Sequence, residues 1–484
     1  MTTLSHELST DEAFNWFVSK DGLFTAVDRI HADFFPPLYS AVLALWMELV
    51  PAGDIALRIP SIVAGLLTIL FTYLLLARAA GARAALVGAL LVALSPLQAT
   101  WSQSVRAFAF EGMFITAFLY FAYRVATLEK GTAKGQFSAF VGLFISLLGA
   151  AYSSHGALFI IFLSCPCLML AAWSRGWSLR SPFTLKVLGT YALVFLCWLP
   201  ELPFILDQIG RSHDLAVTVH RPDAGQMLYE AVTFMGVSLV WTLQPVGVLL
   251  VGVPAALGAF WLYRHARAGF YLLVGASFFY LACMLALYFI VDPLFGRVVE
   301  RGVWMNVLML MLAAIGYAWA THELPKILPA IISEKLWRFG AYAVLVLVVL
   351  LELRGLDNLH RAHTDHWKIL PDLIGDRVEP GDYAVTIPWL SHGSLVYYMP
   401  EQFPEDHVDV AQRPFQWGQH DMNDVIAEMR ERYAGKGTRF WVFVGGNVTD
   451  EMIEPFRAEI LEHIVPPAGE MAIFRFGLEG GDNN

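Results

Sequence analysis

The chain has 484 residues, of which 57% are hydrophobic and only 15% are charged, and its formal net charge is −10. A mean hydropathy of +0.55 excludes an ordinary soluble globular protein and is typical of a polytopic membrane protein. The acidic balance gives no reason to expect a nucleic-acid partner.

Long apolar runs dominate the chain after residue 53. Runs of roughly 17–25 apolar residues can cross a hydrocarbon core of about 30 Å as helices, because a backbone in lipid must satisfy its own hydrogen bonds. We predict about ten such spans. They lie near Asp54–Arg78, Ala84–Pro96, Arg106–Ala126, Phe137–Ala151, His155–Trp173, Phe183–Pro200, Val246–Arg264, Gly269–Ile290, Gly302–Thr321 and Phe339–Leu353.

The basic residues between these spans predict the topology, since Lys and Arg in short loops stay in the cytoplasm. Every second loop is basic: the basic loops carry Arg78 and Arg83; Arg124, Lys130 and Lys134; Arg175, Arg180 and Lys186; Arg264 and Arg267; and Lys326, Lys335 and Arg338. The rule places the first 53 residues, the turn around Trp101–Arg106 and everything after Arg354 outside. We therefore expect a plasma- or inner-membrane protein whose N-terminal and C-terminal segments are extracytoplasmic.

The last segment, Gly355–Asn484, changes composition abruptly. It holds 22 of the 42 acidic residues but 10 of the 32 basic ones, so we predict a soluble domain at 355–484 after a membrane domain at 1–354, in which 1–53 form an outward loop with short helices. A turn at Glu379–Asp382 leads into the first strand. Short β-rich runs and helical runs alternate, which predicts a small α/β domain. The strands are expected at Tyr383–Ile387, Val408–Ala411, Phe440–Val444 and Met471–Phe476, and the helices at Asp421–Ala434 and Met452–Glu462.

Asp11 and Glu12 form an adjacent pair of carboxylates ahead of the first span. Charge near lipid is costly, so such residues are functional candidates. The alternative is that the pair starts a short surface helix, where negative charge at the N-terminus is favourable. No leader with a charged and an apolar region precedes the pair, so either a first span precedes this chain or the N-terminus is exported as a short tail.

Five short motifs follow one another along the chain: Leu8–Phe14, Pro36–Trp46, Ala56–Ser61, Leu94–Ala109 and Tyr152–His155. In this order they resemble the C-type membrane glycosyltransferases related to protein O-mannosyltransferases and the lipid A aminoarabinose transferase. The resemblance covers nearly the whole chain, including the outward C-terminal domain. The chain departs from the usual pattern in three positions, with Phe35 in place of His, Ser104 in place of Glu and Phe108 in place of Tyr, and in lacking the usual first span.

The resemblance implies a GT-C-like helical bundle and an inverting transfer of a sugar from a polyprenyl-phosphate donor to a lipid, glycan or protein acceptor. Such a reaction needs a base for the acceptor hydroxyl and cations for the leaving phosphate. Asp11 is the candidate base, with Glu12 as its orienting neighbour. The candidate donor-phosphate contacts are Arg58, Arg106, Arg297 and Arg301, and the candidate cavity-lining residues are Asp33, Gln103, Tyr152 and His155.

Other interpretations of these residues stay open. An arginine at a helix end can reach to the lipid headgroups and bind no substrate, and the motif arginine of the span after residue 301 is either Arg297 or Arg301. His31 with Asp33 could form part of a divalent-metal site, but their spacing is no recognised ligand pattern, so no obligatory metal is predicted. The alternative function is a transporter or flippase for an anionic lipid or lipid-linked sugar, and a third is a receptor or assembly scaffold.

Overall fold

The structure, a computed structural model, describes residues 6–31, 35–128, 133–178, 181–207, 225, 244–275, 277–278, 303–323, 333–361, 367–387, 391–410, 431–432, 439–445, 460–465 and 471–477. The chain divides into two compact units. Unit 1 comprises residues 1–26, 43–57 and 362–484, and unit 2 comprises residues 27–42 and 58–361.

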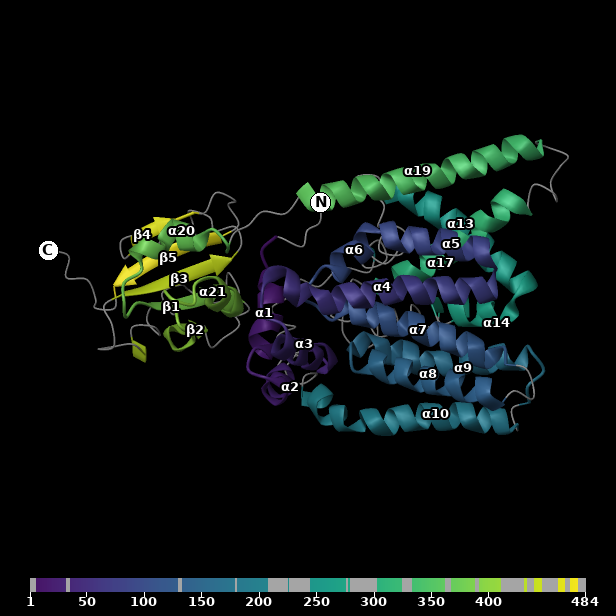
Figure 1. The fold of residues 1–484 in the computed structure, drawn as a ribbon, viewed down its shortest axis with the longest axis horizontal. Coiled ribbons are helices and arrows are strands. Elements are labelled where there is room, and N and C mark those ends of the chain that lie inside the picture. The colour runs from purple at the N-terminus through teal and green to yellow at the C-terminus, as the bar shows by residue number, and fades with distance from the viewer. Residues whose placement is uncertain are drawn as a thin grey trace. The chain divides into compact units, whose positions relative to one another are not determined.

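Unit 2 is a bundle of long helices (Figure 1). Its helices are α4 (Asp54–Ala79, of which the first residues belong to unit 1), α5 (Ala82–Leu94), α6 (Pro96–Ser102), α7 (Phe108–Ala126), α8 (Ala133–Ala151), α9 (His155–Trp173), α10 (Pro182–Trp198), α13 (Gln244–His265), α14 (Arg267–Gly269), α17 (Val303–His322) and α19 (Glu334–Arg361), with a 3-10 turn η2 (Leu199–Glu201) and a π-helical turn η3 (Phe270–Gly275). In the described residues, six helices are long and apolar enough to cross a membrane, or seven if the bent pair α5–α6 is one span.

All but one of the predicted spans coincide with one of these helices. The exception is Gly269–Ile290, of which only the first part is described, as the end of α14, η3 and residues 277–278. The second predicted span is broken. Pro96 clashes with a continuing helix, so α5 ends at Leu94 and α6 starts at an angle of 63°, with the Ser95 hydroxyl accepting the Gln98 N–H.

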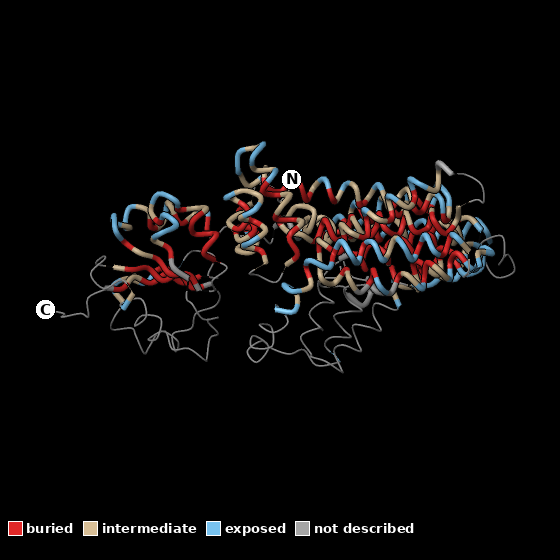
Figure 2. Tube along the Cα trace, turned by 90° about the horizontal axis from the view of Figure 1, so that it is seen from below, coloured by how far each residue is buried: buried red, intermediate tan, exposed pale blue. Residues whose placement is uncertain are grey.

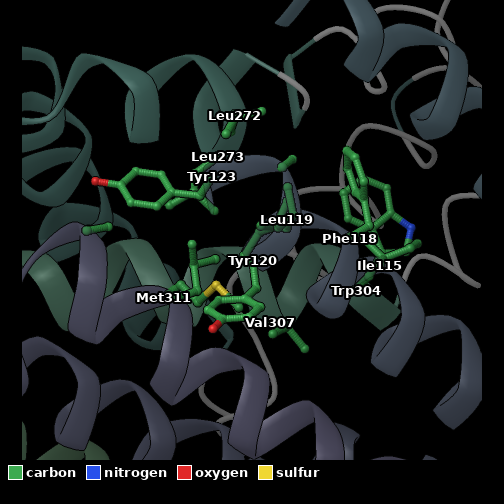
Figure 3. Packing of buried hydrophobic residues seen from close by; sticks show 14 of the residues in the cluster. Ile115, Phe118, Leu119, Tyr120, Tyr123, Leu272, Leu273, Trp304, Val307 and Met311 are labelled. Atoms are coloured by element: carbon green, nitrogen blue, oxygen red, sulfur yellow. The ribbon is translucent and has the colours of Figure 1, made fainter. Parts of the chain in front are cut away.

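The core of unit 2 is apolar and lies between the inner sides of the helices, as the buried residues of Figure 2 show. Figure 3 shows part of it, where Ile115, Phe118 and Leu119 of α7 face Trp304 and Val307 of α17. Lipid tails are as apolar as these side chains, so moving the side chains out of lipid gains little free energy. The helices of the bundle therefore stay associated only where their side chains pack tightly.

Unit 1 combines N-terminal helices with a C-terminal α/β layer. Its elements are α1 (Thr10–Ser19), most of α3 (Leu38–Leu49), the first part of α2 (Leu23–His31), α20 (Leu370–Ile374), η5 (Gly375–Arg377), β1 (Tyr383–Ile387), α21 (His392–Tyr398), η7 (Glu405–His407), β2 (Val408–Val410), β3 (Arg439–Gly445), β4 (Ile460–Ile464) and β5 (Met471–Gly477).

The five strands form one mixed sheet in the order β2-β1-β3-β5-β4. β1 pairs in parallel with β2 and β3, while β5 pairs antiparallel with β3 and β4. The expected turn before β1 is confirmed. Asp382 is buried, its carboxylate accepts bonds from the Trp441 indole at 2.9 Å and from Arg439, and Gly381 takes a φ of +94° that suits glycine.

The predicted helix at Met452–Glu462 is wrong at its end, because Ile460–Glu462 belong to strand β4, which pairs with β5. Edge pairing of this kind is decided by the neighbouring strand and not by the segment itself. Residues 452–459 and most of the helix predicted at Asp421–Ala434 lie outside the described residues. Helices α20 and α21 were not predicted.

Candidate active site

Asp11 and Glu12 lie in the first turn of α1, in unit 1. Asp11 is half-buried and Glu12 is buried. The Glu12 carboxylate accepts the backbone N–H of Ser9 at 2.9 Å, while the Glu12 and Ala13 N–H groups both reach the Ser9 carbonyl. The Glu12 carboxylate on the Ser9 N–H and the Ser9 side chain facing the Glu12 N–H form a capping box, which starts the helix. The sequence alternative, a helix start with favourable charge, therefore describes Glu12 well, and its predicted role beside Asp11 stays a prediction.

Helix α1 packs against α21 within unit 1. Trp16 meets Tyr397 edge to face at 4.8 Å, and Phe17 meets His392 in the same way at 4.7 Å. Gly393 approaches the α1 backbone so closely that a Cβ there would lie 2.7 Å from the Ala13 carbonyl oxygen. Contacts that join the N-terminal and C-terminal parts of the chain thus fix the helix that carries Asp11.

The chain before α1 is also bound to the C-terminal segment. Glu7 is buried and its carboxylate accepts the N–H groups of Trp367 and Lys368 at 2.6 and 2.9 Å. The Tyr398 hydroxyl accepts the Leu8 N–H at 2.6 Å. Burial raises the pKa of Tyr398, so its hydroxyl stays neutral at any physiological pH.

Arg106 lies in unit 2, just before α7, at the end of the bundle where α3 begins; we call this the Arg106 end. Its guanidinium stands over two rings, 5.4 Å from the centroid of Phe35 and 5.2 Å from that of Phe108. Cation–π contacts of this kind hold a planar guanidinium in place. Both rings stand at positions where the chain departs from the family pattern.

A hydroxyl pair supports the Arg106 backbone. Tyr39 of α3 and Ser61 of α4 lie 3.3 Å apart, oxygen to oxygen, and the Ser61 hydroxyl donates to the Arg106 carbonyl at 3.4 Å. Phe110 of α7 meets Tyr39 edge to face at 5.3 Å. Three segments of the chain, two of them in the predicted motifs around Pro36 and Ala56, therefore converge on this arginine.

Arg58 is more deeply buried than the half-buried Arg106. It is one turn before Ser61 on α4 and is only 2% exposed, so its guanidinium faces the protein interior in this structure. Burial of this depth is typical of a structural arginine with internal partners. Its role as a donor contact stays a prediction.

Tyr152 and His155 lie at the Arg106 end as well. The Tyr152 carbonyl accepts the Leu38 N–H at 3.1 Å, and the Tyr152 hydroxyl donates to the Cys197 carbonyl at 2.8 Å, so this residue links α8, α3 and α10. Burial and then the Glu201 carboxylate raise the pKa of Tyr152. His155 begins α9 after the Ser154 cap.

Gln103 ends α6 near the same place, with its backbone N–H bonded to the carbonyls of Ala99 and Thr100. Asp33, Arg297 and Arg301 lie outside the described residues.

Sequence reasoning missed one pair, His31 and Glu201. The His31 Nε2 atom lies 3.1 Å from the Glu201 carboxylate, and the His31 ring stacks on Phe204 with centroids 3.8 Å apart. The two residues are 170 positions apart in the chain. The sequence signal that could have pointed to this pair is Glu201, a carboxylate at the end of the apolar run of α10. Within the described part of the chain, no group of three or more His, Cys, Asp and Glu side chains could hold a metal ion.

The comparisons with known proteins agree with this architecture. The sequence model of the dolichyl-phosphate-mannose-protein mannosyltransferase family matches residues 35–204. The crystal structure of ArnT from Cupriavidus metallidurans in the apo state superposes with a TM-score of 0.63 at 13% identity, over 98% of this chain and 94% of that one. The same enzyme bound to undecaprenyl phosphate gives a TM-score of 0.60 at 13% identity with the same coverage.

A second similar structure is the archaeal oligosaccharyltransferase AglB from Archaeoglobus fulgidus, in complex with an inhibitory peptide and a dolichol-phosphate. Its TM-score is 0.53 at 14% identity, over 100% of this chain and 72% of that one. No curated protein sequence matches significantly. The predicted resemblance to the C-type membrane glycosyltransferases is confirmed, and the chain is an integral membrane protein with their fold.

Proposed function

We propose that the protein transfers a sugar, with inversion, from a polyprenyl-phosphate donor to a lipid, glycan or protein acceptor on the outer face of the membrane. The observation that carries this proposal is the seating of Arg106 at the end of the bundle, within the segment that the mannosyltransferase family model matches. Structures with the same fold hold undecaprenyl phosphate or dolichol-phosphate, which supports a donor of that class.

The roles follow from the charge that moves in the reaction. The bond between the sugar carbon and the phosphate oxygen breaks, and its electron pair stays on the phosphate, whose growing negative charge the Arg106 guanidinium would bind with two N–H groups. The acceptor hydroxyl attacks the sugar carbon from the opposite side, and its proton passes to the Asp11 carboxylate. Asp11 lies in unit 1 and Arg106 in unit 2, so each role has its own test.

Arg106→Lys tests the donor contact. A lysine keeps the charge but cannot bind phosphate through two N–H groups, so the apparent donor affinity should fall about tenfold. The measurement is a titration of purified enzyme with lipid-phosphate sugar, with Arg124→Lys as control, because Arg124 lies at the far end of α7 and binds the Ser138 hydroxyl. An unchanged donor affinity would leave Arg106 as a headgroup-binding arginine.

Asp11→Asn tests the base. The amide keeps the size of the side chain but cannot take a proton, so transfer should fall at least about a hundredfold while donor binding is retained. The control is Asp21→Asn, which removes an exposed carboxylate after the end of α1. Equal transfer rates for wild type and Asp11→Asn, at matched amounts of folded protein, would exclude Asp11 as the base.

Product analysis separates this proposal from the alternative of a transporter or flippase. A transporter leaves the sugar attached to its carrier, whereas a transferase yields a glycosylated acceptor even in detergent, where no compartments exist. The mass of that product also tells a hexose from a pentose.

A further inference from the structure

A cavity of about 470 Å³ opens at the opposite end of unit 2, where the turn between α4 and α5 meets the C-terminal ends of α13 and α17. We call this end the Arg83 end. Its polar and aromatic lining comes from Arg83 of α5, Trp261 and His265 of α13, and Trp319 and His322 of α17. A volume of this size is in the range of small-molecule sites, about 300–1,000 Å³. None of the residues assigned to sugar transfer lines it.

The lining offers donors for an anion. Arg83 is exposed and makes no ion pair or hydrogen bond within the described part of the chain. Arg83 and Ala82 also belong to the first turn of α5, whose backbone N–H groups have no partner inside the helix and carry the positive end of its dipole. Gly81, at a φ of +90°, makes the sharp turn that opens this helix end.

The aromatic residues shape the rest of the cavity. The His265 ring stacks on Trp261 with centroids 5.0 Å apart, and its Nδ1 atom lies 3.0 Å from the Trp261 carbonyl oxygen. One carboxylate opposes an anion, that of Glu323, but it is half-exposed and lies 3.7 Å from the His322 Nε2 atom. The lining therefore carries one arginine and two histidines against a single acid.

The position of the cavity in the bundle favours a lipid headgroup over free phosphate as the bound anion. The Arg83 end carries Arg78, Arg124 and Arg264 in the last turns of α4, α7 and α13, and Arg175 in the turn after α9. The charge rule predicts that this end faces the cytoplasm. Indoles that line the cavity are typical of the headgroup level of a bilayer, and basic pockets between spans on that side suit anionic lipid headgroups. The apolar Ile315 and Ala318 in the lining suit the glycerol and first acyl carbons, which free phosphate lacks.

We propose that this cavity binds the phosphate-bearing headgroup of an anionic phospholipid from the cytoplasmic leaflet, with Arg83 as its main contact. The site is separate from sugar transfer, and its test does not depend on that activity. It would anchor the ends of α5, α13 and α17 to one lipid.

The test uses the purified full chain in detergent, titrated with short-chain phosphatidylglycerol while the melting temperature and the lipid adducts in native mass spectra are followed. Phosphatidylglycerol should raise the melting temperature and phosphatidylcholine should not. Arg83→Ala should weaken the apparent affinity about tenfold, because a hydrogen-bonded charge contact is lost. Arg264→Ala is the matched control. This substitution removes the same charge from the end of α13. Arg264 does not line the cavity, and its guanidinium stands over the Phe260 ring.

The outcomes are distinct. Equal loss in Arg83→Ala and Arg264→Ala would mean general surface charge and would overturn the site, as would no loss in either. Inorganic phosphate that gives the same stabilisation, and competes with the lipid, would overturn the lipid headgroup as the source. Because Arg83 is exposed, its substitution should not unfold the protein. The variants His265→Gln and His322→Gln provide a second, independent test of phosphatidylglycerol binding. Unchanged binding in both variants would refute the proposal.

Discussion

The carboxylates of Asp11 and Glu12 are neighbours in sequence but have different surroundings. Glu12 is buried and bonded to the Ser9 N–H, whereas Asp11 is half-buried on the same turn. A side chain that caps a helix contributes to the stability of that helix. The capping bond therefore gives Glu12 a structural task, while the proposed catalytic roles of Asp11 and Glu12 stay predictions.

Substitution of Glu12 should show this difference. Glu12→Gln keeps an oxygen that can accept the Ser9 N–H, so transfer should stay within about twofold of wild type, whereas Glu12→Ala should lose about 1 kcal/mol of stability. Thermal unfolding and transfer rates measure the two effects, and Ser9→Ala is the control for the cap. A folded but inactive Glu12→Gln protein would mean that the charge of Glu12 takes part in the reaction.

Helices α13 and α17 approach each other through glycines. A Cβ on Gly258 would overlap the Leu312 carbonyl oxygen, and a Cβ on Gly316 would overlap that of Pro254. Spans in lipid associate through tight backbone contacts of this kind. The hydrophobic effect does not drive helices together there, because the lipid tails are as apolar as the side chains. The ends of the same two helices form the lipid cavity proposed above.

Gly316→Ala should therefore force α13 and α17 apart, at a cost of about 1–3 kcal/mol. The measurement is the melting temperature in detergent, and loss of phosphatidylglycerol binding should accompany the fall. Gly189→Ala on α10 is the control, since a Cβ there meets nothing within 4 Å. If both variants melt alike, the close approach of the two helices is not important for stability.

At the scale of the whole molecule, the charge of the loops predicts which side of the membrane each part faces. Impermeant maleimide on intact cells tests it, in a chain whose native cysteines have been replaced. Asp406→Cys, exposed in η7 of unit 1, should be labelled, and Arg175→Cys, exposed between α9 and α10, should react only after the membrane is opened. The reverse pattern would put the Arg106 end in the cytoplasm and exclude a donor on the outer face.

The spans that coincide with helices and the strand Tyr383–Ile387 were predictable because each depends on its own segment. A run of apolar residues is helical in lipid whatever its neighbours are, and a β-rich run after a Pro-Gly turn starts a strand locally. The motif that contains Arg106 was also found locally, as a short sequence motif that occurs in the same order along the chain as in the family.

What the sequence determined by itself was therefore the class of the protein, its spans and the candidates Asp11 and Arg106. Only the tertiary structure decided that Leu8, just before α1, is held by Tyr398, 390 positions away, and that Ile460–Ile464 pairs as a strand. It also decided that His31 meets Glu201 and that Arg83 lines a cavity. The physical reason is the range of the interactions. Hydrophobic periodicity and capping act within a few residues, but edge pairing, buried hydrogen bonds and cavities exist only where distant segments have already been brought together.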